Sequence, residues 1–226
     1  MTINIKKPLL DLLSTKNALL FDLDGTLVDS SCCHEDAFNQ AMELYAPHLL
    51  PSFVYEEVKG LRTDDVFRNL RVEDEDLVKR LTAEKQASYR KRIADGEVKA
   101  FPYVKELLMA LHENGYRLAL VTSASRGSAT SILNNLELVR FFEKVITGED
   151  VTKAKPAPDG YLTCVEQMQV RKEAAIVVED ALSGIEAGRS AGLDVIAVNN
   201  SELARMDEFI GTITDLHAAL LTTMRS

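Results

Sequence analysis

A chain of 226 residues can bury a full hydrophobic core, as one large domain or as two small ones. Its formal net charge of −9 argues against nucleic acid or an anionic membrane as the main partner. No apolar run approaches the roughly 18 residues that a membrane span needs, and residues 1–11 lack the pattern of a secretory signal, so we expect a cytoplasmic protein.

Apolar runs of strand length recur along the chain. They cover residues 18–21, 118–121, 145–147, 175–178 and 195–198, with a weaker sixth run at 211–213. Helical patterns lie between most of them, at residues 103–113, 126–136, 158–168 and 182–191. Strands that alternate with helices of this length predict an α/β fold with a parallel sheet and right-handed crossovers.

The segment between the first and second runs breaks this rhythm. Roughly seventy residues have helical patterns throughout, at 35–45, 52–59, 63–70 and 75–94. An insert of this kind, directly after the first strand and its loop, indicates a separate helical cap.

Asp22 and Asp24 follow the first apolar run directly, two residues apart, and Gly25 lets the backbone turn sharply after them. The carboxyl ends of strands are where ligands bind in open α/β sheets. Two carboxylates in different environments can take opposite roles, one attacking a substrate while the other donates and accepts a proton.

Three later segments place polar residues after predicted strands. Ser123 can hydrogen-bond a phosphate oxygen, although a serine before a helix is often only an N-cap. Lys155, which precedes a proline, can supply a point charge, although an ordinary surface lysine would look the same. Glu179 and Asp180 offer the oxygen ligands that Mg²⁺ prefers. All four segments should meet at one edge of the sheet.

The string Asp-Leu-Asp-Gly-Thr at residues 22–26 resembles the first motif of the haloacid dehalogenase-like hydrolases, most of which are phosphatases. The segments around Ser123, Lys155 and Asp180 are similar to that family's later motifs and follow in the same order. More narrowly, the chain resembles the β-phosphoglucomutase-like branch over nearly its whole length. This resemblance implies an α/β fold with a Rossmann-like parallel sheet core, helices on both faces, and an inserted all-helical cap domain.

The resemblance also implies the domain organisation. Residues 1–29 and 101–226 would form the catalytic core, and residues 30–100 would form the cap inserted after the first strand. Hinges would lie near residues 29–31 and 96–101. Closure of such a cap over a substrate expels water and supplies recognition groups.

The family's pattern assigns catalytic roles to four residues. Asp22 would be the nucleophile that takes the phosphoryl group as an aspartyl-phosphate. Asp24 would protonate the leaving oxygen and then activate the water that cleaves the intermediate. Lys155 would offset the charge of the nucleophile and the phosphate, and Ser123 would bind a phosphate oxygen.

The same pattern implies a bound Mg²⁺. Asp22, the backbone carbonyl of Asp24, and Asp180 would supply three of its oxygen ligands. Glu179 is expected to orient Asp180 or a metal-bound water.

The cap contributes further candidates for substrate binding. His34 stands where the family often has a histidine that engages the substrate or steadies the acid, although a solvated helix histidine is a close alternative. Arg62 lies in a Gly-x-Arg-Thr turn similar to that of sugar- and glycerol-phosphate phosphatases. Lys85 either points inward or belongs to a charged helix face. The β-phosphoglucomutase itself has an arginine in this turn that binds a second phosphate. The corresponding position in this chain is Thr63, which counts against a mutase.

We therefore expect an Mg²⁺-dependent phosphatase, a phosphoric monoester hydrolase, that acts on small phosphomonoesters such as sugar or polyol phosphates. Two alternatives stay open: a phosphosugar mutase of the β-phosphoglucomutase type, and a non-catalytic module that binds phosphorylated metabolites. We expect the protein to be a monomer whose partner is a small-molecule substrate, with no nucleic acid or membrane partner.

Overall fold

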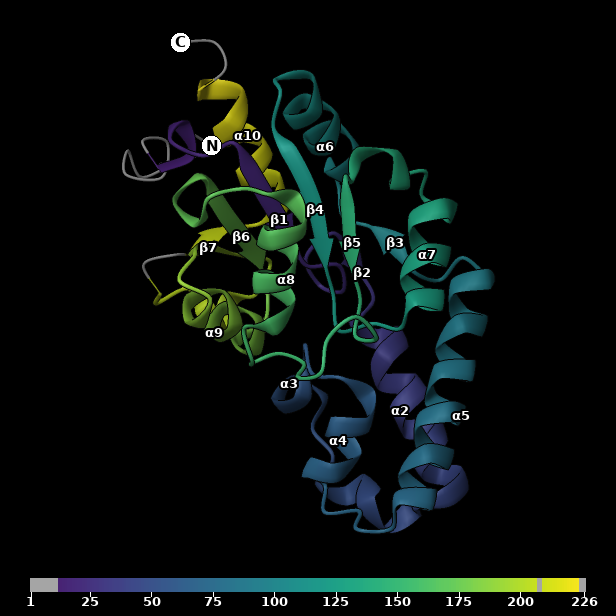
Figure 1. Cartoon of the computed structure of the whole chain (residues 1–226). Helices are drawn as coiled ribbons and strands as arrows, with labels where there is room; N and C mark the ends of the chain where they lie inside the picture. Colours follow the sequence, from purple (N-terminus) through teal and green to yellow (C-terminus); the bar gives the residue numbers. More distant parts are fainter. Residues whose placement is uncertain (1–11, 207–208, 224–226) are drawn as a thin grey trace.

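The computed structural model describes residues 12–206 and 209–223; residues 1–11, where we expected no secretory signal, lie outside the described part. Six parallel strands form one sheet in the order β5-β4-β1-β6-β7-β8. Their bounds are β1 Ala18–Phe21, β4 Arg117–Val121, β5 Lys144–Ile146, β6 Ala175–Glu179, β7 Asp194–Val198 and β8 Phe209–Gly211. The α/β fold with a parallel sheet is confirmed (Figure 1).

The strand order reverses direction around β1, which lies inside the sheet. The chain passes from β1 to β4 and β5 on one side, and then crosses to β6, β7 and β8 on the other. Phe21 is level with Leu120 of β4 and with Val178 of β6. The residues that follow these three therefore share one edge of the sheet, at the switch point where such folds bind ligands.

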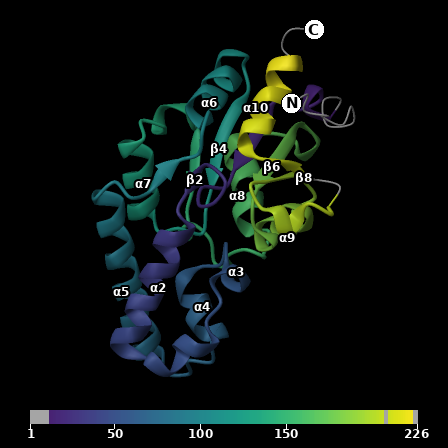
Figure 2. The same cartoon turned by 180° about the vertical axis from the view of Figure 1, so that it is seen from behind.

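Helices cover both faces of the sheet because its strands are apolar on both sides. The residues of β1 alternate between two buried clusters: Leu19 and Phe21 belong to one, and Ala18 and Leu20 to the other. Figure 2 shows the helices around the sheet from behind. The first cluster includes residues of α6 (Val104–Glu113), α7 (Arg126–Asn135) and α10 (Ile213–Thr223), and the second includes residues of α8 (Asp159–Met168) and α9 (Leu182–Ser190).

The cap is the helical segment between β2 and β3, with its own hydrophobic cluster around Phe38, Met42, Phe67 and Leu81. In Figure 1 it lies below the carboxyl ends of the strands. Its helices are α2 Ser31–Tyr45, α3 Tyr55–Val58, α4 Thr63–Asn69 and α5 Glu75–Ala94, with a 3-10 helix at Pro47–Ser52. The inserted helical segment is confirmed, whereas the exact domain bounds at residues 30 and 100 stay a prediction.

Two short strands join the cap to the core. β2 (Val28–Asp29) pairs antiparallel with β3 (Lys99–Ala100), so the chain enters and leaves the cap side by side. These pairs lie at or beside the segments where we expected hinges. A two-stranded ribbon allows the cap to turn as a unit while its two connections stay together.

Three local predictions differ from the structure. The last strand was predicted at residues 211–213 but ends at Gly211, where a φ of +108° turns the backbone out of the strand. The helix α10, which was not predicted, follows it. The Asp215 carboxylate accepts hydrogen bonds from the backbone and hydroxyl of Thr212 and so organises the start of this helix. The helix predicted at 52–59 is only the single turn of α3, and α2 begins at Ser31 rather than at residue 35.

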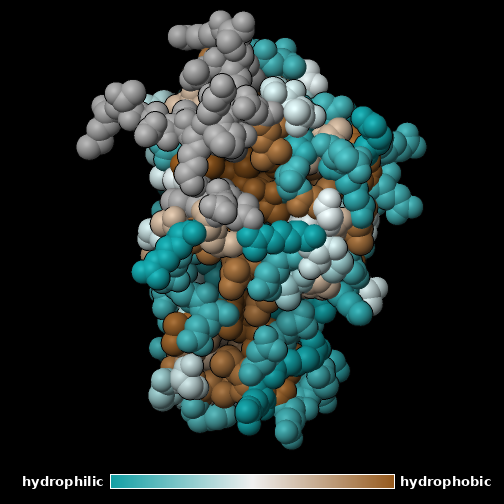
Figure 3. All heavy atoms as spheres, turned by 90° about the vertical axis from the view of Figure 1, so that its left-hand side faces the viewer, coloured by the Kyte–Doolittle hydropathy of each residue, from teal (hydrophilic) through white to brown (hydrophobic). Residues whose placement is uncertain are grey.

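Hydrophilic residues cover much of the face drawn in Figure 3, with apolar residues visible between them. None of the helices in the described ranges is long and apolar enough to cross a membrane.

Leu20 offers a test of how much the sheet core contributes to stability. Its side chain is fully buried in β1, so Leu20→Ala should lower the free energy of unfolding by about 2–5 kcal/mol in urea titrations followed by circular dichroism. Leu44→Ala is the matched control, because Leu44 is 59% exposed and its loss should cost about 0.5 kcal/mol or less. Equal losses in the two variants would contradict this account of the core.

Candidate active site

The carboxyl ends of β1, β4 and β6 bring the predicted site residues together. Asp22 follows β1, Thr122 and Ser123 follow β4, and Glu179 and Asp180 stand at the end of β6. Parallel pairing of these three strands makes the convergence unavoidable once the sheet forms.

Lys155 lies at the centre of this edge and is almost fully buried. Its Nζ donates to Asp22 Oδ1 at 2.6 Å, to Glu179 Oε1 at 2.6 Å and to the Val121 carbonyl at 2.9 Å. Burial alone would lower the pKa of Lys155, but the charges of Asp22 and Glu179 outweigh it and raise that pKa above its usual range. Lys155 is therefore a fixed positive charge against the expected nucleophile.

Asp22, Glu179 and Asp180 form a buried carboxylate cluster whose ligand atoms lie within 4.8 Å of one another. Burial raises the pKa of Asp22, and the nearby charge of Glu179 raises it further. Burial likewise raises the pKa of Asp180 to about 6. Gly25 makes this crowding possible, since a Cβ there would lie 2.1 Å from Asp180 Oδ2.

This cluster fits a divalent cation. Buried carboxylates this close repel one another, and an ion with oxygen ligands removes that repulsion. The side chain of Asp24 is not part of this cluster, and the expected contribution of its backbone carbonyl stays a prediction. Glu179, expected to orient other groups, is part of it, although its Oε1 also accepts hydrogen bonds from Lys155 and from Tyr161 at 2.7 Å.

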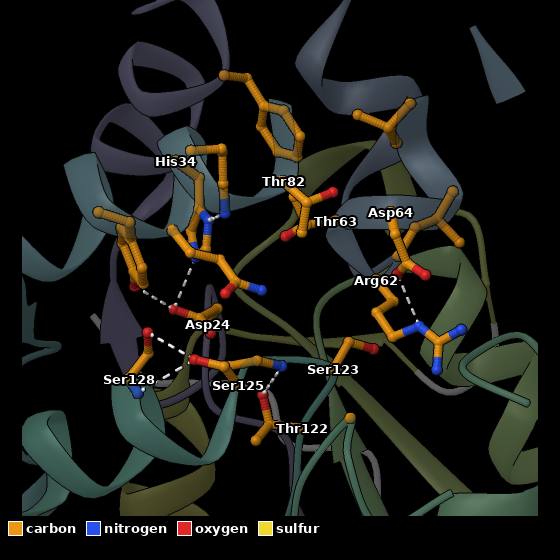
Figure 4. Close-up of a pocket in the computed structure, with 18 of the residues that line it drawn as sticks. Asp24, His34, Arg62, Thr63, Asp64, Thr82, Thr122, Ser123, Ser125 and Ser128 are labelled. Carbon is orange, nitrogen blue, oxygen red and sulfur yellow. Dashed lines mark hydrogen bonds and ion pairs between the residues drawn. The ribbon is translucent and has the colours of Figure 1, made fainter. Parts of the chain in front are cut away.

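Asp24 belongs to a separate network that reaches into the cap (Figure 4). Its Oδ1 accepts hydrogen bonds from Ser30 Oγ at 2.8 Å and from Tyr89 OH at 2.6 Å, and the same oxygen lies 3.0 Å from His34 Nε2. Burial by itself would raise the pKa of Asp24, but the attraction of His34 and these hydrogen bonds outweigh it and leave that pKa below its usual range.

Lys85 completes the network from α5. Its Nζ lies 2.6 Å from His34 Nδ1, and burial lowers the pKa of Lys85 to about 7. Burial and the facing Lys85 lower the pKa of His34 as well. When Lys85 donates to Nδ1, a neutral His34 carries its proton on Nε2, the nitrogen that lies 3.0 Å from Asp24 Oδ1.

A cavity of about 620 Å³ lies between the core and the cap. Asp22, Asp24 and Ser123 line it from the core, and His34 and Arg62 line it from the cap. The five predicted residues that could contact a substrate thus share one cavity, while the buried Lys155 reaches it through Asp22.

Arg62 is held by its neighbours within this cavity. Its Nε donates to Asp64 Oδ1 at 2.8 Å and lies 3.4 Å from Asp65 Oδ2. Figure 4 shows the Arg62 side chain directed toward Asp64. Its positive charge is therefore largely balanced within the turn itself.

Sequence reasoning missed four residues that contact the carboxylates. Lys59 pairs with Asp180 Oδ2 at 2.9 Å, Ser30 and Tyr89 donate to Asp24, and Tyr161 donates to Glu179. The only signal for Lys59 was its place beside the Gly-x-Arg turn, and neither tyrosine stood out from its amphipathic helix.

Comparison with known proteins shows the family. The model for haloacid dehalogenase-like hydrolases matches residues 19–198, so the chain belongs to this family. A phosphorylated carbohydrates phosphatase of Thermotoga maritima is 30% identical over 79% of this chain and 83% of its own length. A phosphoglycolate phosphatase of Nitrosospira multiformis is also 30% identical, over 80% and 82%. The family and these relatives together show that the chain is a phosphatase, that is, a phosphoric monoester hydrolase.

A solved structure supports the fold. The β-phosphoglucomutase of Clostridium difficile superimposes with a TM-score of 0.76, covering 93% of this chain and all of its own, at 21% identity. At this identity the likeness concerns the fold alone.

Lys85→Met should test the network around Asp24. Without Lys85, His34 can adopt its other tautomer, and Asp24 should then lose its fixed orientation as the proton donor. The kcat for an alkyl phosphate should therefore fall about tenfold more than the kcat for p-nitrophenyl phosphate. The nitrophenolate leaves readily without a proton, whereas an alkoxide does not. Lys91→Met, an exposed change on the same helix, is the control. A parallel fall for both esters would assign Lys85 a purely structural role.

Proposed function

We propose that this protein hydrolyses small phosphomonoesters, sugar or polyol phosphates, with Mg²⁺ and through an aspartyl-phosphate on Asp22. The observation that carries the proposal is the contact of the buried Lys155 ammonium with the Asp22 carboxylate at 2.6 Å. A carboxylate that attacks a phosphate dianion must overcome strong repulsion, and a fixed cation beside it lowers that barrier. The carbohydrate phosphatase among the relatives supports the substrate class.

In the first step an Asp22 oxygen forms a bond to phosphorus while the bond from phosphorus to the ester oxygen breaks. Asp24 gives its proton to the departing oxygen. The phosphate of the bound substrate opposes the ionised form of Asp24 and so favours the protonated form that this step needs. Ser123 donates its hydroxyl to a phosphate oxygen.

In the second step Asp24, now ionised, takes a proton from water as the water oxygen attacks phosphorus and the bond to Asp22 breaks. Ser30 and Tyr89 donate to Oδ1 of Asp24, and His34 Nε2 lies 3.0 Å from the same oxygen, which leaves Oδ2 for the reacting proton. The hydrogen bonds hold the carboxylate in one orientation for both steps.

Asp22, Glu179 and Asp180 are the residues that would hold Mg²⁺. When bound, the ion supplies positive charge that orients a phosphate oxygen and offsets the charge that develops during transfer.

The pairing of the cap arginines favours hydrolysis over a mutase. A mutase must hold a second phosphate in the cap while its intermediate turns around. Arg62 is paired with Asp64, and Arg68 is paired with Asp64 and Glu75. Arg62 then serves to position the neutral remainder of the substrate. A non-catalytic binding module is disfavoured because Lys155 contacts the nucleophile Asp22 beside the metal carboxylates, and the acid Asp24 lines the same cavity as Asp22. A cytoplasmic monomer remains a prediction.

Asp22→Asn tests the covalent mechanism. Removal of the nucleophilic charge should lower kcat for sugar phosphates by about 10⁴-fold or more, measured as phosphate release by purified protein with Mg²⁺. Asp95→Asn, an exposed change in the cap, should have no effect. Chelation should silence the wild type reversibly. Appreciable turnover by the Asp22→Asn variant would rule out the aspartyl-phosphate.

Product analysis separates the phosphatase from the mutase. With β-glucose 1-phosphate and a trace of glucose 1,6-bisphosphate, free phosphate should form faster than glucose 6-phosphate. The reason is that Arg62 and Arg68 are both already paired with carboxylates of the cap. The opposite ratio, followed by NMR, would support the mutase.

A further inference from the structure

The cap side of the cavity carries three neutral polar side chains. Thr63 comes from the start of α4, and Thr82 and Gln86 come from α5, about one helical turn apart. Figure 4 shows Thr63 and Thr82 on the cap side of the cavity, opposite Ser123 of the core. All three therefore line the part of the cavity that receives whatever extends from the core into the cap.

Within the described ranges, these three side chains form no hydrogen bond. The hydroxyl oxygen of Thr82 is shielded from solvent and has no partner there, a condition that costs free energy. The Thr63 hydroxyl and the Gln86 amide line the cavity and likewise find no partner among the described residues. A threonine in a helix has two accessible rotamers, so the Thr82 hydroxyl can turn to a ligand. Three hydrogen-bonding groups are thus left for a bound molecule.

The charged side chains of the same region are already engaged. The cations that line it pair with carboxylates of the cap: Arg62 with Asp64, Arg68 with Asp64 and Glu75, and Lys79 with Asp76. Lys85 contacts His34 Nδ1 at 2.6 Å. An anionic group on the far part of a substrate would have to compete with a carboxylate for one of these cations and would be repelled by the others' partners. Among the described residues, the cap wall thus offers free neutral groups and no free cation.

We propose that Thr63, Thr82 and Gln86 bind the hydroxyl groups of the substrate, whose remainder is an uncharged polyhydroxylated chain or ring without a carboxylate or a second phosphate. The inference rests on the proposed function, because it places the ester oxygen beside Asp24 and the rest of the substrate under the cap. Hydroxyl groups both donate and accept, as threonine and glutamine side chains do, whereas an ionised carboxylate only accepts. An analogue without the hydroxyls leaves these polar groups unpaired and is therefore selected against.

The spacing on α5 gives the order of the contacts. Tyr89, whose hydroxyl donates to Asp24, lies three residues after Gln86 and seven residues after Thr82. Residues at these spacings share one face of a helix. Gln86 therefore lies nearer to the ester oxygen along the helix than Thr82, and Thr82 meets the hydroxyls at the far end of a longer chain.

Thr82→Val tests the site, because valine keeps the shape of threonine and removes only the hydroxyl. The substrates are sorbitol 6-phosphate and n-hexyl phosphate, which share chain length and a primary alkoxide leaving group but differ in their hydroxyls. The ratio of their kcat/KM values, measured as phosphate release with Mg²⁺, should fall about fivefold in Thr82→Val and about as much in Gln86→Leu. The kcat/KM of the wild type should be about tenfold or more higher for sorbitol 6-phosphate than for 2-phosphoglycolate, which carries a carboxylate.

Thr130→Val is the matched control, because Thr130 is exposed on α7 and lies outside the set of residues that line the cavity. It should leave the ratio within about twofold of wild type. In circular dichroism melts, Thr82→Val should unfold at or above the wild-type temperature, since it removes a buried hydroxyl without a partner. A melting temperature lower by about 3 °C or more would show that the Thr82 hydroxyl serves the fold, and would overturn its role in binding.

The remaining outcomes separate the hydroxyl site from the proposed function. An equal loss of kcat/KM for both esters in Thr82→Val and Gln86→Leu would overturn the site, and so would a preference of the wild type for 2-phosphoglycolate. In both cases phosphate release would still support the proposed function. If no ester releases phosphate, the proposed function fails and calorimetry decides the inference: sorbitol 6-phosphate should bind the wild type about fivefold more tightly than Thr82→Val, and equal affinities would overturn the site.

Discussion

The buried ammonium of Lys155 is the interaction on which the site depends. The ligand oxygens of Asp22, Glu179 and Asp180 lie within 4.8 Å of one another, and the Lys155 ammonium offsets part of their mutual repulsion by contacting Asp22 and Glu179. Lys155 also donates to the Val121 carbonyl at the end of β4. One nitrogen thus ties the ends of β1, β4 and β6, so the geometry of the sheet edge and its charge balance have the same origin.

The cap completes the balance that the core leaves open. Lys155 contacts neither Asp180 nor Asp24 through any hydrogen bond of the described residues, and both carboxylates find their partners in the cap instead. Lys59 pairs with Asp180, His34 pairs with Asp24, and Tyr89 donates a hydrogen bond to Asp24. The position of the cap is therefore coupled to the electrostatics of the reacting groups, and any ligand that changes those charges changes the energy of closure.

Much of the fold could be predicted because its strands are uninterrupted apolar runs. The predicted run at residues 18–21 is β1 itself, and the other strands of the six-stranded sheet agree within two residues, whereas the short β2 and β3 were not predicted. The predictions failed at helix starts that are determined by tertiary or capping contacts. The first turn of α2 consists of Ser31, two cysteines and His34, which are poor helix formers, and the burial of Cys33 and His34 against their neighbours holds it helical. The start of α10 depends on the reciprocal hydrogen bonds between Thr212, just before the helix, and Asp215 in its first turn.

The site could be predicted only as far as strand topology reaches. Parallel strands carry their following residues to one edge, so Asp22, Ser123 and Asp180 could be brought together from sequence. The spacing of the lysines on α5 held no such information: Lys79 and Lys91 are exposed, whereas Lys85 is buried against His34, and only the rotation of the helix over the core separates them. The charged residues that follow the strands do indicate one general property of the site. The four motifs hold four acidic side chains and one lysine, which indicates that further cations or donors complete the site, but only the packed structure identifies Lys59, His34 and Tyr89 of the cap among them.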